Sequence, residues 1–155
     1  MGHLFTALKQ PEYVHILLNH LPLTGLGVAL IVLLIGMVIR NLIMLRLGLA
    51  LVGLFAFSFW PVSEFGEKGR DRVFAMADDE GRNALQEHEH LAERASKFYY
   101  ALGVIAWIGF GFSWKWPKST FPISALIILL GLFCLTNGFE IANEGGEIRH
   151  REFRS

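Results

Sequence analysis

Long apolar runs without any charged side chain dominate the pattern of this chain. Four windows contain no Asp, Glu, Lys or Arg: residues 13–39, 47–63, 98–114 and 119–139. A membrane-spanning helix needs about 20 mostly apolar residues. The first and last windows reach that length, and the shorter windows 47–63 and 98–114 have apolar or amphipathic extensions. Their continuous Leu, Ile, Val and Gly runs lack the alternation of barrel strands. The pattern predicts four transmembrane helices, over residues 13–39, 42–63, 84–114 and 119–143.

These elements predict an all-α fold: an integral membrane four-helix up-and-down bundle forming a single domain over residues 1–155. A loop over residues 64–83 and a tail over residues 144–155 then lie on the same side as the N-terminus. The composition agrees, because 53% of the residues are hydrophobic and only 18% are charged, against about a quarter in soluble domains. The net charge of zero argues against a nucleic-acid partner. The one cysteine, Cys134, excludes an intrachain disulfide and a CxxCH haem-attachment motif.

The distribution of charge predicts the orientation of the bundle. The two short turns carry Arg40, Arg46, Lys115 and Lys118 and no acidic residue, whereas the ten other basic and all fourteen acidic residues fall on the opposite side. Positively charged loops stay in the cytoplasm. We therefore expect a multi-pass protein of the bacterial inner membrane with both termini in the periplasm. All six histidines then lie at or beyond the periplasmic ends of the helices.

Ionisable side chains at the mouth of an apolar helix usually have a function. The segment HILLNHLP begins the first run and contains His15 and His20, which are separated by about 140° around a helix, so that both cannot face one point. In QEHEHLAERASKFYY, helical spacing places His88 on a stripe of small and apolar residues and His90 on a solvated stripe. We therefore predict that His88 faces the bundle and His90 faces water.

A haem b held by two imidazoles is an economical use of histidines on facing helices. We predict His20 and His88 as the axial ligands, with His15 and His150 as a second pair if two haems are bound. Gly25, Gly27, Ala92 and Ala95 would leave room for the macrocycle. The cations predicted for its propionates are Arg149, Arg151 and Arg94, and the predicted hydrogen-bond partners of the ligand histidines are Asn19 and Glu89.

Three alternatives remain open at this point. The histidines could be interfacial residues that bond to the backbone or water. The chain could be a cofactor-free structural or accessory subunit, since its sixteen glycines suit close helix packing in either case. His15, His20, His88 and Glu89 could instead form a copper or zinc site, because such metals accept histidine and carboxylate ligands.

Three motifs, H-x-L-L-N-H-x-P at 15–22, H-E-x-x-A at 88–92 and G-G-x-I-R-H at 145–150, resemble a family of uncharacterised bacterial four-helix inner-membrane proteins of predicted haem-binding, b-type cytochrome-like character. The resemblance covers nearly the whole chain. It implies that His15, His20, His88 and His150 are the functional positions and that His90 is not. The family continues the last motif with a proline, where this chain has Arg151.

A haem with two axial histidines has no open coordination position, so its chemistry is electron transfer. We therefore expect an electron-transfer component rather than a stand-alone catalyst. It would exchange electrons between membrane quinol and a periplasmic cytochrome or another carrier within a membrane complex. Membrane lipids and the subunits of such a complex are the expected partners.

Overall fold

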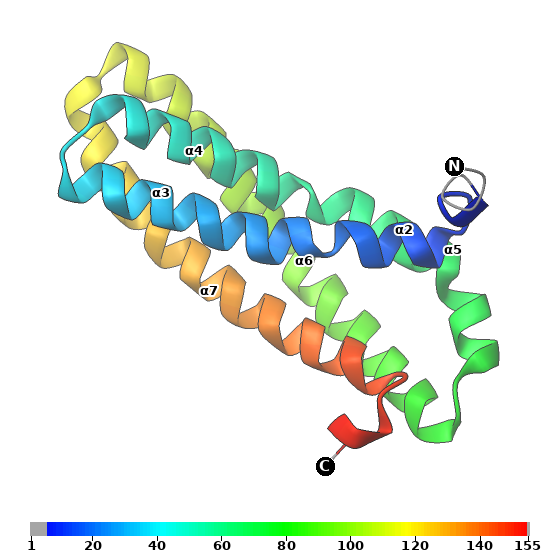
Figure 1. Cartoon of the computed structure of the whole chain (residues 1–155). Helices are drawn as coiled ribbons and strands as arrows, with labels where there is room; N and C mark the ends of the chain where they lie inside the picture. The colour runs from blue at the N-terminus through cyan, green and yellow to red at the C-terminus, as the bar shows by residue number, and fades with distance from the viewer. Residues whose placement is uncertain (1–5, 155) are drawn as a thin grey trace.

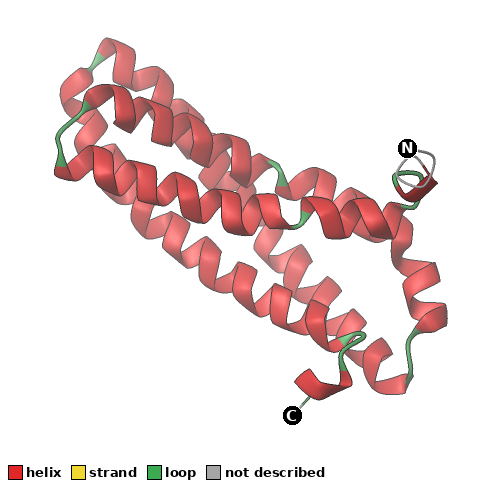
Figure 2. Ribbon diagram, in the orientation of Figure 1, coloured by secondary structure: helices red, strands yellow, loops and turns green. Residues whose placement is uncertain are grey.

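The computed structural model describes residues 6–154, so His3 and Ser155 lie outside the described residues. Every regular element among them is helical, which confirms the predicted all-α class (Figures 1 and 2). In chain order the elements are α2 (Pro11–Leu18), the π-helical turn η1 (Leu21–Gly25), α3 (Leu26–Val38), α4 (Leu42–Phe57), α5 (Phe59–Met76), α6 (Asp79–Lys115), the 3₁₀ turn η2 (Pro117–Ser119), α7 (Thr120–Glu147) and the 3₁₀ turn η3 (Arg151–Phe153).

The helices form two antiparallel hairpins. In the first hairpin, α2 and α3 run out and α4 and α5 run back, while the second consists of α6 and α7 (Figure 1). The hairpins pack through α4 against α6 and α3 against α7. We call the end with the two short turns, at residues 39–41 and 116–119, the turn end. The opposite end, which carries α2, α5, the start of α6 and the end of α7, is called the histidine end.

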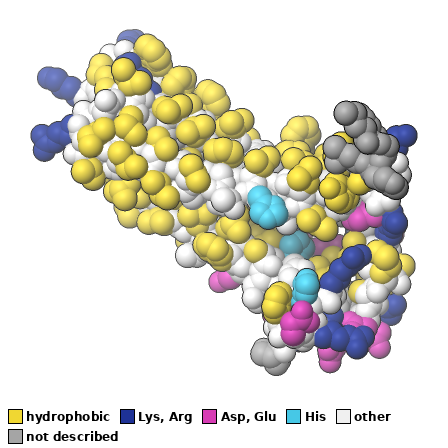
Figure 3. Space-filling view, viewed as in Figure 1, with side chains coloured by type: hydrophobic (Ala, Val, Ile, Leu, Met, Phe, Trp, Pro, Cys, Tyr) yellow, Lys and Arg dark blue, Asp and Glu magenta, His cyan; other side chains and the backbone are white. Residues whose placement is uncertain are grey.

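Three helical segments are long and apolar enough to cross a membrane: Pro11–Val38, Leu42–Met76 and Pro117–Glu147. Large apolar side chains also cover their outer surfaces, with Val38 and Ile43 each 75% exposed and Leu129 67% exposed. Figure 3 shows this apolar surface over the body of the bundle and charged side chains at its two ends. The fourth predicted span lies within α6, whose first half is charged, and only the second half of that helix is apolar.

Glycines allow the helices to approach closely in the core. The side chain of Leu33 lies where a Cβ atom of Gly48 would project, and the side chain of Leu30 occupies the same place at Gly131. Gly25 was expected to make room for a ligand near His20, but the ring of Phe55 fills the space beside it. Small residues therefore serve helix packing here, as they commonly do between apolar helices.

The predicted loop over residues 64–83 is wrong, because most of that segment is helical. Helix α5 continues to Met76, supported by an i,i+4 ion pair in which Glu64 lies 2.8 Å from Lys68. Helix α6 already begins at Asp79, since the carboxylate of Asp78 accepts a hydrogen bond from the backbone of Gly81 and caps the helix.

The predicted end of the last helix is also wrong. The helix was predicted to end at residue 143, but α7 continues through Gly145 and Gly146 to Glu147. No described glycine has a positive φ, so neither residue adopts the left-handed conformation of a C-cap. Gly145 instead lies against the ring of His88, which gives it a different role.

The two hairpins present equivalent positions to the core. The interval in sequence that separates His15 from His88 also separates five pairs of buried residues in α3 and α6: Leu26 and Tyr99, Ala29 and Leu102, Leu30 and Gly103, Leu33 and Ala106, and Gly36 and Gly109. The returning helices match in the same way, and one interval relates Leu45 to Ser124, Gly48 to Ile127, Val52 to Gly131 and Val62 to Ile141. The bundle therefore consists of two similar halves, as in membrane proteins built from parallel repeats.

Candidate functional site

His15 and His88 meet at the histidine end of the bundle. Their ring centroids lie 6.2 Å apart and their planes are inclined by 80°. His15 belongs to α2 and His88 to α6, which are the outgoing helices of the two hairpins. The pair therefore brings together two helices that occupy equivalent places in the two halves.

Each ring is oriented by a backbone carbonyl of its own hairpin. The Nδ1 atom of His15 lies 2.8 Å from the carbonyl oxygen of Val62, and that of His88 lies 2.8 Å from the carbonyl oxygen of Ile141. A carbonyl oxygen can only accept a hydrogen bond, so Nδ1 carries the proton in both rings. In the neutral form of this tautomer Nε2 keeps a lone pair, which is the form of histidine that binds a metal.

A glycine accompanies each of these hydrogen bonds. Gly66 follows Val62 by one helical turn, and a Cβ atom at Gly66 would lie 2.9 Å from Nδ1 of His15. Gly145 follows Ile141 by the same spacing, and a Cβ atom there would lie 3.2 Å from Nδ1 and Cε1 of His88. Both glycines allow an imidazole to reach a carbonyl on the surface of the neighbouring helix. The same arrangement thus occurs twice, once in each hairpin.

The predicted orientation of the α6 histidines is confirmed. His88 is partly buried and contacts α7, whereas His90 is exposed. The stripe that continues from His88 is buried at Ala95 and Tyr99, as its helical spacing predicts. Phe59 stacks on Tyr99 with ring centroids 4.6 Å apart, so a packed aromatic layer lies next to the pair on the side of the bundle core.

The structure pairs His88 with His15 rather than with His20. His20 is exposed and lies just before the π-helical turn η1, where the buried Pro22 interrupts the α-helix. The predicted separation of His15 and His20 around the helix agrees with this arrangement, but it could not show which of the two faces inward.

His150 and Arg149 are also exposed and do not join the pair. His150 lies 3.0 Å from Glu152 and packs beside Phe153, while Arg149 reaches the sulfur of Met76 at 3.9 Å. The predicted pairing of His15 with His150 is therefore not formed in this structure.

The predicted partners of the ligand histidines have other roles. Glu89 pairs with Arg70 of α5, with Nε of the arginine 2.8 Å from a carboxylate oxygen, and this ion pair links the two hairpins beside the histidines. Asn19 is exposed at the end of α2. No group of three or more His, Cys, Asp or Glu side chains within residues 6–154 is placed to hold a metal ion. The four-ligand copper or zinc site of the sequence analysis is thus not assembled.

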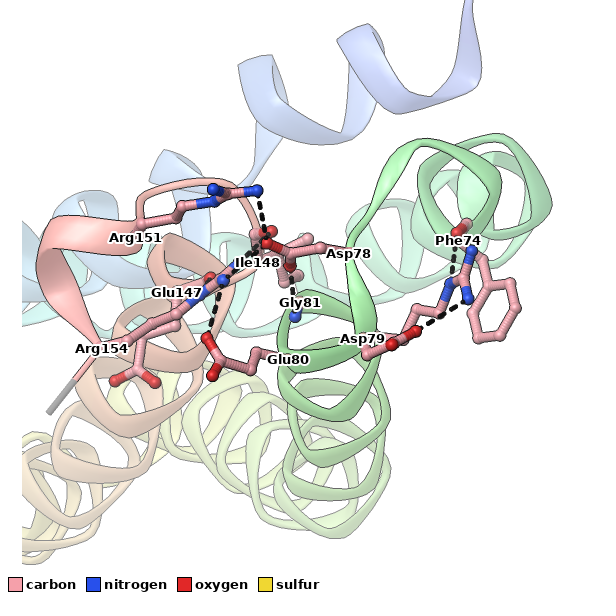
Figure 4. Close-up of polar contacts among 10 residues, drawn as sticks. Phe74, Asp78, Asp79, Glu80, Gly81, Glu147, Ile148, Arg151 and Arg154 are labelled. Atoms are coloured by element: carbon pink, nitrogen blue, oxygen red, sulfur yellow. Dashed lines mark hydrogen bonds and ion pairs between the residues drawn. The ribbon is translucent and has the colours of Figure 1, made fainter.

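The C-terminal segment packs against the turn between α5 and α6. Arg154 places one guanidinium nitrogen 3.0 Å from each carboxylate oxygen of Asp78, and Arg151 approaches the same carboxylate at 3.0 Å (Figure 4). These hydrogen bonds and charges, of which the bond from Arg154 is the strongest cause, lower the pKa of Asp78 to about 2. The cluster fixes the tail beside the histidine end.

The roles of Gly66 and Gly145 and of the carbonyls of Val62 and Ile141 were not predicted from the sequence. Their position inside a helix was a signal for the two glycines. Glycine there costs about 1 kcal/mol relative to alanine, and it often marks a close approach of another group. Comparison with protein-family models, with curated proteins and with solved structures gives no match for this chain.

Proposed function

We propose that this protein is an integral membrane electron-transfer protein that binds haem b between His15 and His88. The observation that carries the proposal is the pair of rings, each with Nδ1 engaged by a carbonyl and Nε2 left free. A metal–imidazole bond is about 2 Å long, so an iron held between the two rings would place their centroids roughly 6 Å apart. The separation of 6.2 Å fits such a pair.

The similarity of the two hairpins also supports the proposal. Each half contributes one histidine, one orienting carbonyl and one glycine from matching positions. A haem held by two histidines would take the same kind of ligand from each half. The hairpins also diverge at the histidine end, where α2 packs on α5 and α6 packs on α7 (Figure 1).

The residues of the chain would have distinct roles in this function. His15 and His88 would bind the haem iron, and the carbonyls of Val62 and Ile141 would hold the ring planes and increase the basicity of the ligand nitrogens. Arg149 would offer a positive charge to a propionate. A haem held by these two histidines would supply one-electron chemistry. The protein would exchange electrons with membrane quinol and with a periplasmic or complex-bound carrier, at a bacterial inner membrane with the histidine end outside.

A spectrum of the purified protein tests this function. We expect Soret and α-bands in the reduced-minus-oxidised spectrum and stoichiometric iron. His15→Ala and His88→Ala should abolish or shift these bands, whereas His20→Ala and His90→Ala are matched controls that remove an exposed histidine from the same two segments. Absence of both iron and bands would overturn the haem proposal and favour a cofactor-free accessory subunit. Loss of the bands in His20→Ala but not in His15→Ala would reassign the ligand.

A further inference from the structure

A second site lies at the turn end, far from the histidines. An open pocket there is lined by Arg40, Leu42, Leu45, Pro117, Lys118 and Phe121. These residues come from the turns of both hairpins and from the first residues of α4 and α7. The pocket therefore combines two cations with an apolar wall formed by Leu42, Leu45 and Phe121.

The two cations of this pocket have no counterion among the described residues. Within residues 6–154 neither Arg40 nor Lys118 forms a side-chain ion pair or hydrogen bond. The other two basic residues of the turn end are engaged, because Arg46 bonds to Ser113 and Lys115 lies over the ring of Trp116. No acidic residue occurs between Glu12 and Glu64 or between Glu93 and Glu140. Figure 3 accordingly shows dark blue side chains without magenta ones at this end.

Arg40 also holds a costly backbone conformation. Its φ of 51° is the only positive value of a non-glycine residue in the described part of the chain. Arg40 follows α3 in the left-handed conformation that glycine usually adopts after a helix, and the backbone N–H of Asn41 bonds to the carbonyl of Gly36 at 2.9 Å. A Cβ atom makes this conformation unfavourable for any residue other than glycine. An arginine at a position suited to glycine indicates that its charge has a use.

We propose that this pocket binds the phosphate of an anionic phospholipid, with Arg40 and Lys118 as its cationic partners. The apolar wall would receive the glycerol and the first part of the acyl chains. Trp114 and Trp116, both exposed, mark the level of the headgroups, where tryptophan is enriched. Basic pockets between helices on the cytoplasmic side bind anionic lipid headgroups by this chemistry. The proposal rests on the membrane embedding of the proposed function but not on haem.

Native mass spectrometry of the full chain tests the site. The protein would be released from nanodiscs of phosphatidylcholine with a minor share of phosphatidylglycerol. We expect one retained phosphatidylglycerol per chain. Each basic side chain near an anionic surface contributes about fivefold in affinity, so the double variant Arg40→Gln with Lys118→Gln should weaken retention by about 25-fold. The double variant Lys9→Gln with Lys97→Gln removes the same charge from two exposed side chains elsewhere and should retain the lipid.

Two further measurements distinguish lipid binding from the effects of misfolding and from binding of free phosphate. Arg40→Gly relieves the backbone strain and should fold at least as well as the wild type while losing affinity, so a loss of lipid there cannot come from misfolding. Inorganic phosphate at millimolar concentration should not displace the lipid. Displacement by phosphate, equal loss in both double variants, or equal retention of phosphatidylcholine would each overturn the proposal. Haem bands should remain unchanged in all these variants, so failure here is distinct from failure of the haem site.

Discussion

The imidazole of His15 stands nearly perpendicular to that of His88, with an angle of 80° between their planes. The angle follows from the hydrogen bonds to Val62 and Ile141, which fix each ring against the returning helix of its own hairpin. Because the two halves are similar, the same bond is made twice and turns the two rings in different directions. The mutual orientation of the rings is thus a property of the bundle.

This angle predicts the electronic signature of a bound haem. Perpendicular axial imidazoles leave the iron orbitals nearly degenerate, so we expect a strongly anisotropic low-spin ferric signal with a large maximum g value. Electron paramagnetic resonance of the oxidised protein at low temperature measures it. A rhombic low-spin signal, which parallel imidazoles give, would contradict the ring geometry described above.

Alanine at Gly66 or Gly145 should disturb the histidine that packs on it. The added Cβ would lie 2.9 Å from Nδ1 of His15 or 3.2 Å from Nδ1 of His88, which forces the ring away from its carbonyl. We expect a destabilisation of about 1–3 kcal/mol from the crowding and a change in the haem bands and the ferric signal. Thermal unfolding in detergent and the two spectra measure these effects.

Gly27 and Gly111 provide matched controls for these two variants. A Cβ atom at either position meets nothing within 4 Å. Gly27→Ala and Gly111→Ala should therefore stabilise their helices slightly, by about 0.5–1 kcal/mol, and leave both spectra unchanged. Equal spectral changes in control and test variants would mean that the glycines near the histidines have no positioning role.

The charge-free windows and the helical spacing of the sequence predict much of this fold, and the structure shows why they do not predict the rest. Three of the windows lie in segments able to span a membrane, and spacing alone orients His88 and His90. Helical spacing could not show whether His15 or His20 faces inward. The π-helical turn at Leu21–Gly25 lies between these histidines and α3, and it changes the rotation that regular helical spacing would predict. Helical spacing also could not show that Gly66 and Gly145 face imidazoles. The spacing within one helix does not determine which residues of a neighbouring helix it contacts.

Tyr99 supports the site from the core, and its hydroxyl is predicted to contribute to stability. It is 1% exposed and donates a hydrogen bond of 3.0 Å to the carbonyl oxygen of Cys134. Tyr99→Phe should lower the free energy of unfolding by about 0.6–1.5 kcal/mol, the range for such bonds between helices. Tyr13→Phe removes a hydroxyl from an exposed ring and should have no effect. An unchanged unfolding temperature in Tyr99→Phe would show that the bond contributes nothing.

The carboxylate of Asp78 is predicted to control the order of the tail through its charge. Its pKa of about 2 lies below the ordinary 3.8 because the ionised form accepts bonds from Arg154 and Gly81. A lowered pKa in the folded state means that this stabilisation is complete above about pH 4 and is lost as the pH falls towards 2. Carbon NMR of the Asp78 carboxyl group should give a midpoint near 2, and a midpoint near 4 would contradict the contacts in Figure 4.

Asp78→Asn tests the role of the charge apart from the role of the helix cap. The variant removes the charge, but asparagine caps a helix as well as aspartate does. The variant should keep the start of α6 intact while amide exchange accelerates in the tail, at the protons of His150, Phe153 and Arg154 that are bonded within it. Hydrogen exchange at neutral pH measures both regions. Asp71→Asn changes a fully exposed carboxylate of α5 and should leave the tail protected. If Asp78→Asn left tail exchange unchanged, the carboxylate would have no role in holding the tail, and packing of Phe153 against Gly146 would have to account for its order.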